Sequence, residues 1–109
     1  MYKIKGSAAE NRVGLAKAVA GHAYGVNVET LRRPGRGTGN VSRARQVAMY
    51  LARVSLQVGP VAVARSFGRD HKAVAHACKQ VEAGRQDPAF NRTIDWLETL
   101  VRRATEVPA

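Results

Sequence analysis

The sequence predicts an all-α fold, a compact helical domain that contains a helix-turn-helix. Strand signals are nearly absent, because β-branched residues never alternate with polar ones over a useful length. Alanine-rich stretches with helical spacing recur along the whole chain instead. A chain of 109 residues can bury roughly two-thirds of its unfolded surface, enough for a core without disulfides or metal. We therefore expect residues 1–109 to form a single domain.

The first expected helix extends from about Ala9 to Tyr24 and ends at Gly25, a typical C-cap residue. A single helical turn over Val28 to Arg32 follows; Asn27 is its candidate cap and Pro34 stops it. The apolar side of the first helix is predicted to consist of Leu15, Ala16, Val19, Ala20 and Ala23.

A glycine-rich basic loop over residues 34–41, with Arg36 at its centre, precedes a second long helix from about Ser42 to Gln57. At about 100° per residue, Arg45 and Arg53 lie on the side of this helix opposite its apolar seam. That side is expected to contact phosphates. Met49 also falls there, so either another helix covers it or the seam is broader. The predicted seam contains Val47, Leu51, Val54 and Val58.

The segment over about residues 60–83 predicts the helix-turn-helix. A short helix from Pro60 to Phe67 is followed by a turn at Gly68 and a helix from Asp70 to about Ala83. The second helix has an apolar side with Val74, Ala77, Cys78 and Val81. Its opposite side carries Lys72, His76 and Lys79, with Arg69 at the entrance. A helix with this pattern suits the major groove of DNA.

The last helix is expected over about residues 88–106, with Asp87 as N-cap and Pro88 in the first position. Its predicted seam contains Phe90, Ile94, Leu97 and Val101. Two interpretations of Trp96 stay open. The first places it in the core, and the second makes it a docking residue for a protein partner.

The positive charge is concentrated in the centre of the chain. The chain holds 18 Lys+Arg against 8 Asp+Glu, a net charge of +10. Residues 32–81 hold ten bases against the lone Asp70, a net charge of +9. This clustering favours a folded nucleic-acid-binding face over an incidental basic surface. A single cysteine and no long apolar run predict a cytoplasmic protein without a membrane partner.

Catalytic and metal-binding constellations are not predicted. His71 and His76 are five residues apart and point in different directions on a helix, and Cys78 has no second cysteine, so zinc geometry is lacking. The glycine-rich loop follows no strand and lacks the Gly-Lys-Ser/Thr ending of a phosphate loop. We therefore expect no enzymatic activity, no cofactor, no metal and no small-molecule substrate.

Asp70 has two competing roles as the only acid among the ten central bases. Its carboxylate can cap the helix that follows, a contribution of about 0.5–2 kcal/mol. It can instead accept a hydrogen bond from a cytosine amino group, which discriminates between bases by roughly 1–3 kcal/mol.

Two segments resemble a known family. Arg43-Ala-Arg-Gln-Val-Ala-Met-Tyr-Leu-Ala-Arg53 and Phe67-Gly-Arg-Asp-His-Lys-Ala-Val-Ala-His-Ala-Cys78 are similar to the C-terminal DNA-binding domain (domain IV) of the bacterial replication initiator DnaA. The resemblance implies a TrpR-like helical fold. It also implies an arginine in the minor groove, for which Arg36 is the nearest candidate, and phosphate contacts from the second long helix.

The resemblance further implies that Asp70, His71 and His76 lie on the helix that reads the major groove. The family's Thr-Thr pair is replaced here by Lys72 and Ala73, and one glycine of its turn is lost, so the initiator's target sequence is not expected. The candidate DNA-contacting residues are Arg36, Arg43, Arg45, Arg53, Arg69, Asp70, His71, Lys72, Ala73, His76 and Lys79.

We expect a sequence-specific transcription regulator that binds double-stranded DNA at the nucleoid, and an activator in preference to a repressor. Stand-alone bacterial domains of this type resemble phage-derived regulators and activators of gene transfer agents. One alternative is a replication-control protein that competes for initiator boxes. Another is a protein-interaction module that docks RNA polymerase or a companion transcription factor.

Overall fold

A computed structural model describes residues 8–33, 35, 37 and 39–105, and every regular element in these ranges is helical. The N-terminal elements are α1 (Ala8–Tyr24), α2 (Val28–Arg32) and α3 (Gly39–Tyr50), which continues into the π-helical turn η1 (Leu51–Ser55). They are followed by α4 (Pro60–Phe67), α5 (His71–Gly84) and α6 (Pro88–Thr105). The predicted all-α fold with a helix-turn-helix at α4 and α5 is confirmed.

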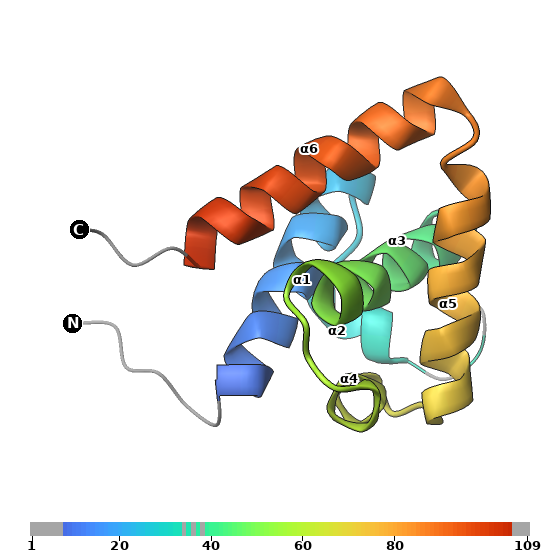
Figure 1. Ribbon diagram of the computed structural model, residues 1–109. Helices are drawn as coiled ribbons and strands as arrows, with labels where there is room; N and C mark the ends of the chain where they lie inside the picture. Colours follow the sequence, from blue (N-terminus) through green and yellow to red (C-terminus); the bar gives the residue numbers. More distant parts are fainter. Residues whose placement is uncertain (1–7, 34, 36, 38, 106–109) are drawn as a thin grey trace, which may run out of the picture.

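Helix α3 lies at the centre of the molecule. It packs against α1 and α5, while α6 crosses η1 and α1, and α4 contacts α5, α1 and α2 (Figure 1). Because helices surround α3, Val47, Ala48, Met49 and Tyr50 are all buried in succession. The buried surface of this helix is therefore broader than the predicted seam, which explains why Met49 lies in the core.

Most predicted core positions are buried or half-buried, but three are exposed. Val54 is 42% exposed because it lies in η1, where Leu56 N donates to Leu51 O at 2.9 Å, an i to i+5 bond that breaks the 100° spacing. Ala23 is exposed because the buried stripe of α1 follows Val13, Ala16 and Ala20. Trp96 is 62% exposed, so its interpretation as a core residue is wrong.

The helix boundaries agree closely with the expected ones around the helix-turn-helix. Gly68 ends α4 in the left-handed region at φ 63°, where glycine is favoured, and Arg69 N donates to Ala64 O. Asp70 caps α5, since its side chain accepts from Lys72 N at 2.9 Å. Helix α3 begins at Gly39, three residues earlier than predicted, and residue 106 of the predicted last helix lies outside the described residues. Asn27 precedes α2 but makes no side-chain cap bond.

Candidate nucleic-acid interface

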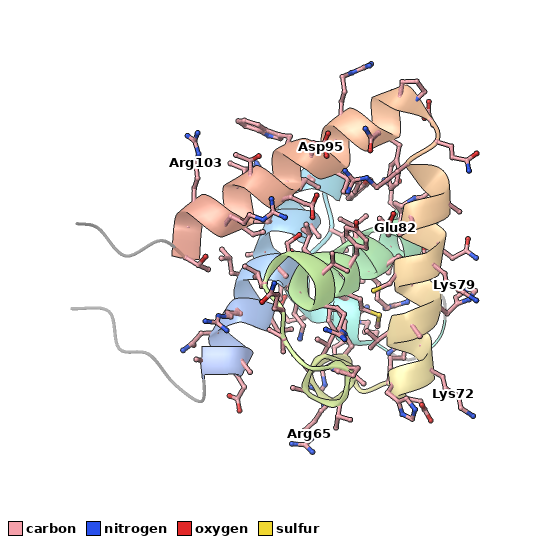
Figure 2. The ribbon with its side chains drawn as sticks, in the orientation of Figure 1. Arg65, Lys72, Lys79, Glu82, Asp95 and Arg103 are labelled. Atoms are coloured by element: carbon pink, nitrogen blue, oxygen red, sulfur yellow. The ribbon has the colours of Figure 1, made fainter. Side chains whose placement is uncertain are left out.

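The outer face of α5 presents the predicted polar row to solvent. Lys72, His76 and Lys79 are exposed, while Val74 and Ala77 on the inner side are buried. Figure 2 shows the side chains of Lys72 and Lys79 extending away from the body of the molecule on the same side of α5. The amphipathic character predicted for this helix is confirmed, and its exposed face can enter a groove of a duplex.

An open groove of about 820 Å³ runs along one flank of α5, between this helix and η1. Arg53 and His71 line it together with Gln57, and Arg53 is exposed as predicted. The thiol of Cys78 borders the same groove, and burial raises its pKa. The flank therefore combines a cation with an imidazole at the N-terminal end of α5.

A second hollow, of about 450 Å³, lies on the opposite flank of α5. Gly35, Arg69, Ala73 and His76 line it, so the loop before α3 lies beside the exposed face of α5. The two described glycines within this loop, Gly35 and Gly37, adopt positive φ values of 85° and 73°. Arg36, the predicted minor-groove arginine, lies outside the described residues.

Arg45 does not lie on an outward face, so that expectation is wrong. Its side chain is only 7% exposed, because the loop and α2 cover the side of α3 where it lies. Its Nε donates to Leu31 O at 2.8 Å and its Nη1 to Gly35 O at 3.1 Å, while Nη2 reaches the carbonyls of Arg33 and Thr30 at 3.4 and 3.5 Å. Burial, and to a lesser degree the charge of Arg69, lower the pKa of Arg45.

Arg69 reaches the same segment from the turn between α4 and α5. Its Nη2 donates to Arg33 O and to Gly35 O, both at 2.9 Å, and its Nη1 donates to Phe67 O at 3.0 Å. The carbonyl of Gly35 thus accepts from both Arg45 and Arg69. We call these two arginines the carbonyl clamp. It ties the carbonyls of Arg33 and Gly35 to α3 and to the turn of the helix-turn-helix.

Two further cations hold the C-terminal end of α4. The ammonium group of Lys17 donates to Ser66 O at 2.7 Å and lies 4.7 Å from the ring centroid of Phe67. Arg32 Nη1 donates to the same carbonyl at 3.0 Å. Cations at a helix C-terminus also complement its dipole. Burial and the charge of Arg32 lower the pKa of Lys17.

Arg43, another predicted contact, lies 4.5 Å from the centroid of the Phe90 ring and is half-buried. The stacking anchors the start of α6 to α3.

Asp70 performs the first of its two predicted roles, the helix cap, and also lies 3.2 Å from Nδ1 of His71. Its carboxylate remains exposed, so the second role, base recognition, stays a prediction.

A polar network centred on Arg85 was missed at the sequence level. Arg85 Nη1 donates to Glu98 Oε1 and to the hydroxyl of Tyr50, both at 3.1 Å, and Nη2 pairs with Asp95. Tyr50 in turn donates to Glu82. Desolvation and this hydrogen bond raise the pKa of Tyr50 to about 12. The network joins the C-terminal end of α5 to α3 and α6, which fixes the angle at which α5 is presented.

Arg85 lay in a segment interpreted as a connection between two helices, so only its spacing from the acids of α6 could have indicated a bridge.

In the described part of the chain, no group of three or more His, Cys, Asp or Glu side chains is placed to hold a metal ion. Within the same ranges, no helix has the length and apolar character needed to cross a membrane.

Comparison with known proteins places this geometry in a family. Residues 15–81 match the model for the helix-turn-helix of the bacterial DnaA protein. A chromosomal replication initiator protein DnaA 1 of Protochlamydia amoebophila is 38% identical over 92 residues, covering 84% of this chain and 19% of the relative. DnaA 2 of Chlamydia trachomatis is 40% identical over 68 residues, covering 62% and 14% respectively.

A solved structure titled as a DNA replication initiation factor superposes with a TM-score of 0.77 at 29% identity, covering 85% of this chain and 29% of that one. The chain spans about a fifth or less of the length of the DnaA relatives that it matches. The matched residues include all of α3, η1 and α4 and most of α5. The chain therefore belongs to the family of the bacterial DnaA helix-turn-helix domain.

Proposed function

We propose that this chain binds double-stranded DNA sequence-specifically, with α5 in the major groove and the loop before α3 in the adjacent minor groove. The observation that carries the proposal is the exposed row of Lys72, His76 and Lys79 on the second helix of a helix-turn-helix. Helix α5 has 14 residues, about 21 Å, which suits a groove of a duplex. The loop beside its flank supports simultaneous contact with both grooves.

Base recognition in this proposal depends on the N-terminal half of α5. Lys72 offers a long cation that can reach guanine or a phosphate, and the methyl group of Ala73 can contact thymine. Asp70 adds an exposed carboxylate acceptor. Arg53 and Lys79 supply phosphate contacts at either side. The clamp arginine Arg69 acts mainly on the position of the loop.

We further propose that the bound protein regulates transcription at the nucleoid, as an activator, with RNA polymerase or a companion transcription factor as its partner. The replacement of the family's Thr-Thr pair by Lys72 and Ala73 supports a target other than initiator boxes. The second candidate function is replication control by occupation of those boxes. It is favoured by the 38% identity to a protein named as a chromosomal replication initiator.

Selection of binding sites from a random duplex pool tests the proposal. A defined motif is expected, and equal retention of all sequences would refute sequence-specific binding. Competition with an initiator's DNA-binding domain on initiator boxes separates the two candidates. Displacement of the initiator at comparable concentration would favour replication control, whereas binding only to the selected motif supports a separate regulatory target.

A further inference from the structure

An apolar groove lies between α1 and α6, away from α5. It has a volume of about 440 Å³, and its lining includes Ala18, Val19, Ala23, Trp96, Leu97 and Leu100. Trp96 is 62% exposed and Leu100 is 36% exposed. A tryptophan and a leucine exposed side by side over an apolar floor are typical of an interaction surface.

The charges around this groove are positive. Arg92 lies four residues before Trp96 and Arg103 seven after it, so all three fall within about 40° on α6. Both arginines are exposed, and neither forms an ion pair with a residue that the structure describes. The two acids of α6, Asp95 and Glu98, are paired with Arg85. The groove therefore has mostly apolar walls, to which His22 and Thr93 add the only polar side chains of its lining among the described residues, and a cation toward each end.

We propose that this groove binds an acidic amphipathic helix of a partner protein. The lining part of α6, from Thr93 to Leu100, extends about 10 Å. That length accommodates two turns of a helix whose apolar side chains are three or four residues apart. Carboxylates at the flanks of such a helix would face Arg92 and Arg103.

A second copy of this chain fits the groove poorly. A symmetric contact through this face would bring Arg92 and Arg103 against the same arginines of the other copy, and each copy carries a net charge of +10. Figure 2 shows Arg103 and Lys72 at opposite corners of the molecule. A partner in the groove therefore leaves α5 accessible. The inference builds on the proposed regulatory function, in which a DNA-bound protein contacts a partner.

A displayed library of helical peptides, selected on the whole chain and counter-selected on the Trp96→Ser variant, tests the proposal. We expect enriched peptides to combine acidic residues with apolar ones spaced three or four apart. Trp96 is the only tryptophan, so its fluorescence should shift to shorter wavelength when such a peptide binds. Trp96→Ser should weaken binding at least about tenfold. Leu100→Ser provides a second variant if the first loses its thermal transition.

Charge reversal provides the matched control. Arg103→Glu and Arg65→Glu change the net charge equally, but Arg65 projects from α4, on the side of the molecule away from α6 (Figure 2), and α4 contributes no residue to the groove. Weaker peptide binding by Arg103→Glu with little effect of Arg65→Glu supports the proposal. Equal weakening by both variants would contradict it, because it would show that the peptide is attracted only by the net charge of the chain. An absence of Trp96-dependent peptides would overturn it. A shift of the Trp96 fluorescence with phosphatidylglycerol vesicles alone would overturn the proposal and identify a lipid surface as the occupant of the groove. Self-association that depends on Trp96 would overturn it in favour of a second copy of the chain.

DNA affinity is measured on the same variants, using the motif selected from the random pool. Trp96→Ser should bind that duplex as the unchanged chain does. A failure to find any DNA motif would overturn the proposed function, while peptide binding at the groove would stand independently.

Discussion

Replacement of Arg45 by methionine separates a positioning role from a phosphate contact. Methionine keeps an unbranched apolar chain in place of the arginine's methylene groups but removes its charge and donors. In the structure those donors are directed at backbone carbonyls of α2 and the loop, of which Leu31 O and Gly35 O are within 3.1 Å. We therefore expect Arg45→Met to lower the free energy of unfolding and to weaken DNA binding through displacement of the loop.

The magnitude follows from the two short bonds. Each hydrogen bond from a charged donor contributes about 1.5–3 kcal/mol. Gly35 is exposed, so water can replace the donor at its carbonyl, whereas Leu31 is buried. We therefore expect a loss of about 2–4 kcal/mol in the free energy of unfolding. A domain of this size has about 5–15 kcal/mol in total, so the variant should remain folded at 25 °C.

Two measurements check this prediction. Urea denaturation gives the change in the free energy of unfolding, and DNA titrations at several salt concentrations give the slope of log K against log salt. Arg45→Met should leave that slope nearly unchanged because the guanidinium contacts carbonyls. The matched variant Arg53→Met, on the exposed flank, should reduce the slope by about 0.9 and leave stability nearly unchanged. Unchanged stability together with a slope reduced by about 0.9 in Arg45→Met would refute the positioning role.

Three further predictions concern α5 and its support. Lys72→Ala should change or relax the selected DNA motif, and an identical motif would contradict a reading role for this side chain. Arg85→Met should cost about 1.5–3 kcal/mol of unfolding free energy because Glu98 Oε1 loses its charged donor, while Glu98 Oε2 keeps Ser55 and Arg102. The exposed Arg102→Met should cost less than about 1 kcal/mol. The raised pKa of Tyr50, about 12, means that the fold favours the protonated phenol. Its contribution of about 2–3 kcal/mol should be present below pH 10 and disappear as the pH rises from 10 to 12. Tyr50→Phe should lack this part of the pH dependence, and identical alkaline unfolding profiles would refute it.

The elements that the sequence predicted best are those with strong local signals. Pro60, Gly68 and Asp70 define the ends of α4 and the start of α5 through backbone conformation and capping. These effects depend only on residues that are neighbours in the sequence, so the sequence alone predicts them. The two faces of α5 were predictable for the same reason, since a helix with one covered side shows the 3.6-residue period directly. Val54 was misplaced because the π-helical turn changes that period, and no residue type in the segment announces it.

The positions of the arginines were less predictable, because residue type does not distinguish a cation bound to a carbonyl from one that faces solvent. On α3 the apolar Met49, one turn after Arg45 on the same stripe, was the available signal that this side is covered. Trp96 shows the converse error. Its size favoured burial, yet the seam of Ile94, Leu97 and Val101 already covers α1 and η1, so Trp96 on the other side of α6 is left exposed.

The cations of the central segment therefore fall into two groups, those that bind backbone carbonyls and those that are available to contact phosphates. The number in the second group predicts the salt dependence of DNA binding. Of the ten bases in residues 32–81, Arg32, Arg45 and Arg69 donate to backbone carbonyls. If all ten neutralised phosphates, the slope of log K against log salt would be about −9; with the other seven it should be no steeper than about −6. Titration on the selected duplex measures this slope. A value near −9 would show that the carbonyl-bound arginines turn toward DNA, and that the loop is held by something other than the carbonyl clamp in the complex.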